Sequence, residues 1–368
     1  MPLSRVNPDQ YQQQLAEKFT RISSQFAQFS PPPLEVYDSP PLHFRVRAEF
    51  KIWHQDEGSY YAMFKQSEPK TPVLLEDFPI GSRTINHLMT ELMAIIVQQP
   101  ILRHKLFQIE FLTTLSGEAL VSLIYHKALD DAWLQLAQPL QQQLNIKIIG
   151  RSKKQRLVLS DDYVTEVLEV NGKRYQFQQV ENSFTQPNAS VNQKMLEWAR
   201  SNSADNGDDL VELYCGNGNF TVVLAQNFDK VLATEISKTS VKSARHNFEI
   251  NQVDNVTIAR MSSEDFSSAL AGEREFRRLK DIDLKAYNFS TVLVDPPRAG
   301  LDSLTEELIS RFDNILYISC NPDTLHNNLL QLCQTHRIEK FAIFDQFPYT
   351  DHVECGVVLK KSTQQGSS

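Results

Sequence analysis

The chain has 368 residues, of which 41% are hydrophobic and 22% are charged, and its net charge is −8. No apolar run approaches the roughly 18 residues of a membrane span, and the first residues lack the apolar core of a signal peptide. The four cysteines form no CxxC pair and show neither zinc-ligand spacing nor a disulfide framework. We therefore expect a cytoplasmic protein with reduced thiols, room for two domains and no membrane partner.

The charge is spread unevenly along the chain. Residues 1–180 contain 19 Lys and Arg against 19 Asp and Glu, so the whole excess of negative charge lies in residues 181–368. A net charge of −8 argues against a nucleic-acid partner, but a neutral first half with local basic clusters leaves such a partner open.

The first half predicts an α+β domain over residues 1–180. Residues 9–29 carry apolar side chains at spacings of three and four, which is typical of an amphipathic helix. Residues 42–53 alternate apolar and polar, as a half-exposed strand does. A further helix over 80–98 and two strand-like runs over 106–113 and 119–126 follow. The apolar positions of the first helix are Tyr11, Leu15, Phe19, Ile22, Phe26 and Phe29.

Cations on the 42–53 strand are candidates for contact with nucleic-acid phosphates. Arg45, Arg47 and Lys51 occupy outward positions of that strand. Phe107 follows two cations, a combination suited to a phosphate and a stacked base. A solvated strand face and a buried phenylalanine explain the same patterns equally simply.

The second half, residues 181–368, predicts an α/β domain. From Leu210 onward strands and helices alternate, which is the pattern of a parallel, doubly wound sheet. Ligands of such sheets bind at the carboxyl ends of the strands. The predicted strands are Leu210–Tyr214, Val231–Glu235, Val256–Met261, Thr291–Asp295, Ile315–Ser319, Glu339–Phe344 and Glu354–Leu359.

A glycine-rich turn after the first of these strands indicates a cofactor site. The run Tyr214-Cys215-Gly216-Asn217-Gly218-Asn219 lets the backbone approach a ligand closely, and Glu235 ends the next strand, where an acidic side chain accepts bonds from ribose hydroxyls. The third glycine of the dinucleotide fingerprint is missing, so S-adenosylmethionine fits better than NAD. An ordinary tight turn is the alternative.

Two further strand ends carry reactive groups. Asp295 stands before two prolines that stiffen the backbone, and Cys320 follows a strand and precedes the turn Asn321-Pro322. Cys320 is placed to present a thiolate, although an isolated cysteine is more often buried packing. With the glycine turn, these residues make three strand ends that face one crevice.

The motifs together resemble the RNA uracil-5-methyltransferase family, and within it the branch that acts on tRNA. The resemblance covers nearly the whole chain. It rests on Ser183–Asn188, Leu213–Phe220, Val294–Arg298, Ser319–Pro322 and His352–Cys355, with Phe44–Phe50, Leu102–Phe107 and Asp345–Thr350. It implies a Rossmann-like S-adenosylmethionine-dependent methyltransferase domain joined to an N-terminal RNA-binding domain.

The resemblance also implies roles for single residues. Cys320 is the expected nucleophile towards uracil C6 and Glu354 the expected acceptor of the C5 proton. Arg298 is expected to meet a phosphate or the uracil carbonyl, and Arg45, Arg47, Lys51 and Phe107 the RNA. The expected cofactor contacts are Gln186, Tyr214, Asn219, Glu235 and Asp295. How Gln186 and Asp295 divide between the cofactor and the uracil stays open.

The implied substrate is the T-loop uridine at position 54 of tRNA, with tmRNA as a further candidate. We expect a monomer with no metal and no iron–sulfur cluster, since four cysteines cannot ligate a cluster without using the nucleophile. Two alternatives remain: an enzyme of the same chemistry acting on ribosomal RNA, and an RNA-binding or RNA-folding module whose catalysis is secondary.

Overall fold

The computed structural model describes residues 3–65 and 68–362. It contains two compact units that are not consecutive halves of the chain. One unit comprises Met1–Pro8, Pro40–Val167 and Gln178–Ala189, and the other comprises Asp9–Ser39, Leu168–Phe177 and Ser190–Ser368. The N-terminal helix therefore belongs with the C-terminal part of the chain and not with the residues that follow it.

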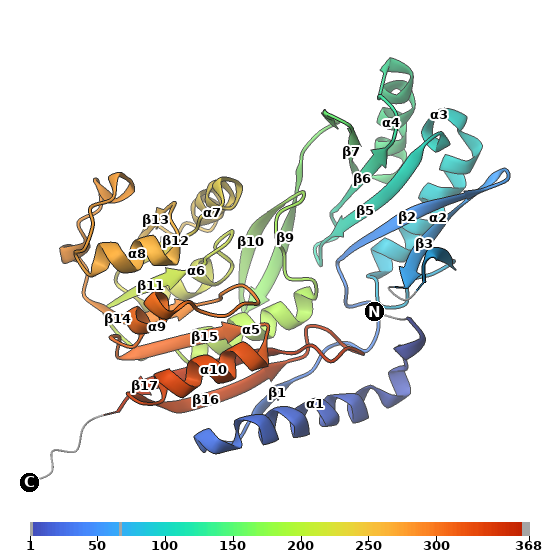
Figure 1. Cartoon of the computed structure of the whole chain (residues 1–368). Coiled ribbons are helices and arrows are strands. Elements are labelled where there is room, and N and C mark those ends of the chain that lie inside the picture. Colours follow the sequence, from blue (N-terminus) through green and yellow to red (C-terminus); the bar gives the residue numbers. More distant parts are fainter. Residues whose placement is uncertain (1–2, 66–67, 363–368) are drawn as a thin grey trace, which may run out of the picture. The chain divides into compact units, whose positions relative to one another are not determined.

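The second unit is built on an eight-stranded sheet with the order β1-β16-β17-β15-β14-β11-β12-β13 (Figure 1). All seven strands that the sequence predicts in residues 181–368 are present, and β1 adds an eighth at the edge beside β16. The strands are β1 (Glu35–Tyr37), β11 (Asp209–Leu213), β12 (Val231–Thr234), β13 (Val256–Ala259), β14 (Phe289–Val294), β15 (Asn314–Ser319), β16 (His336–Phe344) and β17 (Glu354–Lys361).

The sheet is parallel except at β17, which runs antiparallel to both β15 and β16. A parallel partner for β16 needs a crossover of a dozen or more residues, whereas residues 345–353 leave room only for a reversal of direction. Because β17 is inserted backwards, its first residue, Glu354, lies at the edge of the sheet where the parallel strands end. The position of the predicted base depends on this reversal.

Helices cover both faces of this sheet, as the doubly wound pattern predicts. One face packs its apolar residues against α1 (Tyr11–Phe26), α8 (Ser263–Leu270), α9 (Ser303–Ile309) and α10 (Pro322–Leu332). The other face meets α5 (Ala189–Ser201), whose Trp198 contacts Phe344 of β16 with ring centroids 5.7 Å apart. The remaining helices of this unit are α6 (Asn219–Leu224) and α7 (Lys238–Ile250).

Helix α1 forms where its apolar spacing predicts, but one position differs. Phe19 is 38% exposed, while the neighbouring Lys18 is only 6% exposed. Ile22 and Phe26 are fully buried, and Phe26 packs edge-on against Phe341 of β16 at 4.9 Å. The buried face of α1 is thus rotated from the one that apolar spacing alone indicates, because Lys18 finds partners in the C-terminal part of the chain.

The first unit is an α+β fold on a seven-stranded sheet with the order β4-β3-β2-β5-β6-β7-β8. Neighbouring strands are antiparallel except β6 and β7, which are parallel and are joined through α4. The strands are β2 (Arg47–Gln55), β3 (Gly58–Lys65), β4 (Glu68–Leu75), β5 (Leu106–Thr113), β6 (Ala119–Tyr125), β7 (Lys147–Ser152) and β8 (Gln155–Val158). The helices are α2 (Arg83–Gln98), α3 (Pro100–Arg103) and α4 (Asp131–Leu144).

Strands β9 (Tyr163–Val170) and β10 (Lys173–Val180) pair with each other in a two-stranded ribbon. In the part of the chain that the structure describes, no helix combines the length and the hydropathy needed to cross a bilayer.

Candidate active site

Strand register places Cys320 opposite Glu354. In the antiparallel pair of β15 and β17, Ser319 lies opposite Cys355, and the residues that follow at this end of the pair are Cys320 and Glu354, whose charge acts on the Cys320 thiol. Directly opposite residues on antiparallel strands have Cβ atoms about 4.5–5.5 Å apart. The predicted nucleophile and the predicted base are therefore cross-strand neighbours.

Asp295 shares their side of the sheet. Val294 of β14 pairs with Tyr317 of β15, which puts Asp295 at the same end of the neighbouring strand. Val294, Tyr317 and Cys355 all point into the core beneath α8, α9 and α10. Since side chains alternate along a strand, Asp295, Cys320 and Glu354 project from the opposite face. The structure brings these three predicted residues together.

Glu354 has the properties of a carboxyl group prepared to take a proton. Its residue is 5% exposed, and its carboxyl group makes no hydrogen bond or ion pair within residues 3–65 and 68–362. Burial, and secondly the charge of Asp295, raise the pKa of Glu354 to about 8. Burial also raises the pKa of Asp295, to about 7. A base with a pKa near the working pH combines adequate strength with a usable ionised fraction.

The thiol of Cys320 is half-buried, and its charged neighbours shift its pKa in opposite directions. Burial, then the carboxylates of Glu354 and Asp295, raise the pKa of Cys320 to about 11, and the nearby guanidinium of Arg298 lowers it. Helix α10 begins two residues later, with Pro322 at its first position and the side chain of Asn321 accepting a hydrogen bond from Asp323 N. A helix N-terminus favours a negative charge, so this end of α10 favours the thiolate.

Arg298 is exposed and lies on the loop next to this group. Its Nη2 donates to Nδ1 of His352 at 3.2 Å, and its backbone oxygen accepts from Asn321 Nδ2 at 3.0 Å. Three segments that end at the site, after β14, after β15 and before β17, are thereby tied together. The sequence reveals no role for His352 because its contact is with a residue 54 positions away.

The glycine turn after β11 has the shape of a ligand cradle. Tyr214, Gly216 and Gly218 have φ values of +63°, +57° and +82°, a left-handed conformation that glycine adopts without strain. A Cβ atom built on Gly216 meets no atom within 4 Å, so the space above this glycine is open. A Cβ atom on Gly218 comes within 2.8 Å of Phe248 of α7, so this glycine permits close packing of the helix.

Glu235 and Asn219 hold the turn in place. The carboxylate of Glu235 accepts hydrogen bonds from Gly216 N at 3.0 Å and from Ser237 N at 2.7 Å. The amides of Asn219 and Asn192 exchange two hydrogen bonds of 2.9 Å, and the hydroxyl of Tyr214 lies 2.5 Å from that of Ser263. Tyr214, Asn219, Glu235 and Asp295 therefore surround one turn at one edge of the sheet, which fits a nucleoside whose ribose hydroxyls need a carboxylate partner.

Sequence reasoning missed Glu212, a carboxyl group on β11 that is 1% exposed. Among the residues that the structure describes, its Oε2 meets no hydrogen-bond partner, and burial raises its pKa to about 8. The charge of Asp295 acts in the same direction. An acidic residue inside an otherwise apolar strand is the signal that could have identified it. The remaining predicted cofactor contact, Gln186, belongs to the first unit and stays a prediction.

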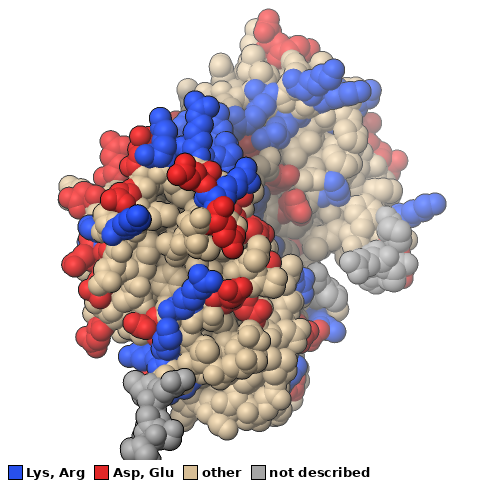
Figure 2. All heavy atoms as spheres, turned by 60° about the vertical axis from the view of Figure 1, so that its left-hand side comes forward, with Lys and Arg blue, Asp and Glu red and all other residues tan. Residues whose placement is uncertain are grey.

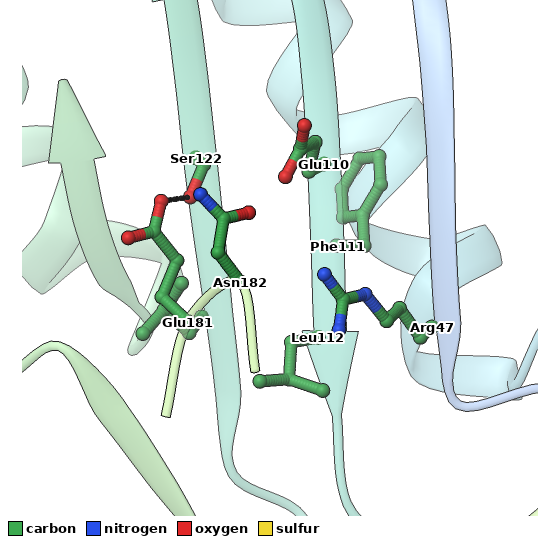
Figure 3. Close-up of a pocket in the computed structure, with 8 residues that line it drawn as sticks. Arg47, Glu110, Phe111, Leu112, Ser122, Glu181 and Asn182 are labelled. Carbon is green, nitrogen blue, oxygen red and sulfur yellow. Dashed lines mark hydrogen bonds between the residues drawn. The ribbon is translucent and has the colours of Figure 1, made fainter. Parts of the chain in front are cut away.

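In the first unit, Arg47 lies in a small hollow of the sheet face, together with two carboxyl groups (Figure 3). Its Nη1 donates to Ser183 O at 2.6 Å, and Glu110 and Glu181 line the same hollow. Arg45 is half-buried, and its Nε donates to Arg47 O at 2.8 Å. Burial lowers the pKa of Arg45, opposed by Glu49. Both arginines donate a hydrogen bond to a backbone oxygen of their own unit, so neither extends as an unpaired cation from an open strand face.

Lys51 and Phe107 form a layered group. The Lys51 ammonium lies 3.9 Å from the centroid of the Phe107 ring and donates to Gln108 Oε1, and His126 stacks on Phe107 at 4.1 Å. Two groups this close to one ring centre cannot share a face, so both faces of Phe107 are covered. A base cannot stack directly on Phe107 without displacing one of them, whereas the side chain of Lys51 is half-exposed.

Two of the four cations in the basic run 151–156 form ion pairs within their own unit. Arg151 binds both carboxylate oxygens of Glu181 at 2.5 Å, and Arg156 bonds to Glu181 at 3.2 Å and to Asp162 at 2.8 Å. Lys153 and Lys154 at the turn are exposed. Although the net charge is −8, Lys and Arg side chains form a group in the upper part of the face that Figure 2 shows.

Comparisons with known proteins identify the kind of chain to which this site belongs. The family model described as tRNA (Uracil-5-)-methyltransferase matches residues 10–362. The chain is 59% identical over 360 residues to the tRNA/tmRNA (uracil-C(5))-methyltransferase of Saccharophagus degradans, covering 98% of this chain and 99% of the relative. It is 58% identical over 351 residues to the protein of the same name from Cellvibrio japonicus, covering 95% and 96%.

A solved structure shares the fold. The crystal structure of Pyrococcus abyssi tRNA (uracil-54, C5)-methyltransferase in complex with S-adenosyl-L-homocysteine matches with a TM-score of 0.72 at 21% identity, over 95% of this chain and 83% of that one. The Rossmann-like fold predicted from the sequence is thereby confirmed.

Proposed function

Because the chain belongs to the tRNA (uracil-5-)-methyltransferase family, its reaction is the transfer of a methyl group from S-adenosyl-L-methionine to C5 of uracil in tRNA, and we propose that the transfer proceeds through a covalent bond between Cys320 and the base. The observation that carries this proposal is that Cys320, directly after β15, lies beside Glu354 at the start of β17 and beside Asp295.

Uracil C5 is a weak nucleophile, and the residues at this edge of the sheet are proposed to activate it. The Cys320 thiolate adds to C6, and the electron pair released from the C5–C6 double bond gives C5 carbanion character. Bound S-adenosyl-L-methionine supplies an electrophilic methyl group. After C5 is methylated, the carboxylate of Glu354 accepts the C5 proton, the double bond re-forms, and the C6–S bond breaks to release the thiolate.

The other residues of the site hold the reacting groups. The turn 214–219 and Glu235 are placed to bind the nucleoside part of the methyl donor, with Glu235 directed at the ribose. Arg298 and the N-terminus of α10 favour the thiolate form of Cys320. A uridine inside a folded T-arm cannot reach this edge in place, so it must be turned out of its stack.

The substrate we propose is the uridine at position 54 in the T-loop. Relatives that are 59% and 58% identical are named tRNA/tmRNA (uracil-C(5))-methyltransferases, so tmRNA is a second candidate substrate. We place the reaction in the cytoplasm and expect the monomer to carry it out.

Locating the methyl group tests this proposal. Purified protein, labelled S-adenosyl-L-methionine and separate samples of unmodified tRNA, tmRNA and ribosomal RNA should give label in 5-methyluridine at tRNA position 54. Label confined to ribosomal RNA would contradict the substrate assignment, and label at any atom other than C5 would contradict the chemistry. A tRNA in which cytidine replaces uridine 54 is the matched control.

We further propose that the first unit binds the RNA backbone, with Lys51 as the best-placed of the predicted cations. Lys51→Ala should weaken tRNA binding and reduce the slope of log K against log salt by about one, because one released counterion is lost with each phosphate contact. Cofactor binding should be unchanged. Lys70→Ala on the edge strand β4 is the control, and a Lys51→Ala slope equal to that of this control would remove Lys51 from the RNA interface.

A further inference from the structure

Lys18 of α1 is a buried lysine whose hydrogen bonds all go to one segment of the chain. Its Nζ donates to Asp345 Oδ1 at 2.6 Å, to Phe347 O at 2.9 Å and to His352 O at 2.9 Å. An ammonium group has three protons, so these three bonds satisfy it completely. The side chains of Lys18 and Asp345 are 7% and 1% exposed. This charge pair is enclosed by protein and is not a surface ion pair.

The three acceptors lie within residues 345–353, the segment that joins β16 to β17. Asp345 directly follows the last residue of β16, and His352 lies two residues before Glu354, the first residue of β17. Val353 between them is fully buried. Lys18 therefore holds both ends of the segment that delivers Glu354 to its place opposite Cys320.

Other residues of α1 reinforce the same attachment. The hydroxyl of Tyr11 donates to Asp345 Oδ2 at 2.9 Å and accepts from Ser39 N at 2.7 Å. The Tyr11 ring packs edge-on against that of Tyr349, with centroids 5.9 Å apart. Tyr349 has a φ of +63°, so the segment turns through a left-handed residue at its middle. Arg21 Nη2 also donates to Asp351 O at 2.7 Å.

A charge pair of this kind is a costly way to fill space. Desolvation lowers the pKa of Lys18, and the attraction of Asp345 opposes the change. An apolar side chain of similar length would avoid that desolvation, but it could not bind three oxygens at defined positions. The arrangement therefore serves to define the path of residues 345–353.

We propose that Lys18 is a positioning residue for Glu354: by fixing residues 345–353 it sets the distance between the Glu354 carboxylate and the C5 proton, and so controls the last stage of the reaction. This inference rests on the proposed role of Glu354. In the controlled step the C5 proton passes to the carboxylate, its electron pair re-forms the C5–C6 double bond, and the C6–S bond electrons return to Cys320.

The test uses Lys18→Met in the full chain, with tRNA that carries tritium at C5 of the target uridine. Lys18→Met should slow tritium release by about tenfold or more, because proton transfer depends steeply on the placement of the base. Adduct formation and the KM for tRNA should change little. A denaturation-resistant adduct between protein and methylated RNA should therefore accumulate, as it should with Glu354→Gln.

Two further variants separate positioning from folding. Tyr11→Phe removes one hydrogen bond to Asp345 and keeps the ring, so it should produce the same adduct in a smaller amount. Lys194→Met removes an ion pair to Asp38 elsewhere in this unit, 2.6 Å long and more exposed, and should produce none. Tyr11→Phe can decide the question even where Lys18→Met does not fold.

The outcomes distinguish the two proposals. If Glu354→Gln accumulates adduct while Lys18→Met and Tyr11→Phe lose adduct formation and tritium release in equal proportion, α1 only supports the fold and the positioning role is wrong. If Tyr11→Phe matches the parent while Lys18→Met is unfolded, the positioning role is also wrong. If Glu354→Gln itself releases tritium at the parent rate, the assignment of the base fails first.

Discussion

Cys320→Ala should abolish methyl transfer, lowering the single-turnover rate by roughly 10⁴-fold or more, because without the thiolate uracil C5 never gains carbanion character. Binding of tRNA and of S-adenosyl-L-homocysteine should stay close to that of the parent, since Cys320 makes no hydrogen bond to the turn 214–219 within the described residues. The measurement is transfer of labelled methyl to tRNA under single-turnover conditions, with equilibrium binding of each ligand measured in parallel.

The chain contains a closely matched control for this thiol. Cys333, at the end of α10, is also half-buried, and burial alone raises its pKa to about 11, as in Cys320. It lacks the neighbours Glu354, Asp295 and Arg298 that influence Cys320. Cys333→Ala should therefore transfer methyl groups at the parent rate. Transfer by Cys320→Ala at a rate close to that of Cys333→Ala would rule out the covalent mechanism.

Glu354→Gln should stop the reaction after methyl transfer. The amide preserves the shape of the side chain but cannot accept the C5 proton, so the bond between Cys320 and C6 should persist. We expect a denaturation-resistant adduct of protein and methylated tRNA on gels, with turnover lowered by about 10²–10⁴-fold, the range for a general base. Glu306→Gln on α9, another carboxyl group whose pKa is raised by burial, should turn over freely and leave no adduct.

The pH dependence of the same step follows from the raised pKa of Glu354. Only the ionised carboxylate can take the proton, so tritium release from a preformed adduct of the parent with methylated tRNA should increase with pH and level off above about pH 8. Glu354→Gln should lack this rise. A parent profile that falls between pH 6 and 8, or an unchanged rise in the variant, would mean that another group is the base.

Stability provides an independent check on the buried state of Glu354. The native state binds this proton more tightly than the unfolded chain, whose glutamate pKa is near 4.3, so the parent loses stability as the pH rises from about 4 to about 8. Glu354→Gln has no such group to titrate. The melting temperature of Glu354→Gln minus that of the parent should therefore be greater at pH 8.5 than at pH 5. A cooperative melting transition of the variant also shows that its adduct does not result from unfolding.

Several parts of this site could be predicted because they depend on residues that are close in sequence. The alternation of strands and helices after Leu210 predicts seven strands with ends within three residues of those observed, and Asp295 and Cys320 lie at the ends of two of them. The turn 214–219 is indicated in the sequence by its two glycines, and in the structure both have a positive φ. Such features are set by local sterics and by the burial of short apolar runs, which any reader of the chain can count.

What the sequence could not predict depends on contacts between distant residues. The reversal of β17, which brings Glu354 opposite Cys320, is decided by pairing with β15 and β16 and not by the composition of β17 itself. Apolar spacing places Phe19 inside, yet Lys18 is buried because three oxygens more than 320 residues away compensate its charge. Phe107 is predicted to stack on RNA, but Lys51 and His126 already cover its ring.

The sequence by itself thus determined the fold class and the family and proposed the reacting groups, because these follow from local pattern and from motifs read along the chain. Only the tertiary structure decided that α1 belongs to the second unit, that Glu354 lies beside Cys320, and that Lys18 holds the segment between β16 and β17. The physical reason is that a buried charge or a strand direction is stable only through its partners, and the local pattern of a helix or strand does not contain those partners.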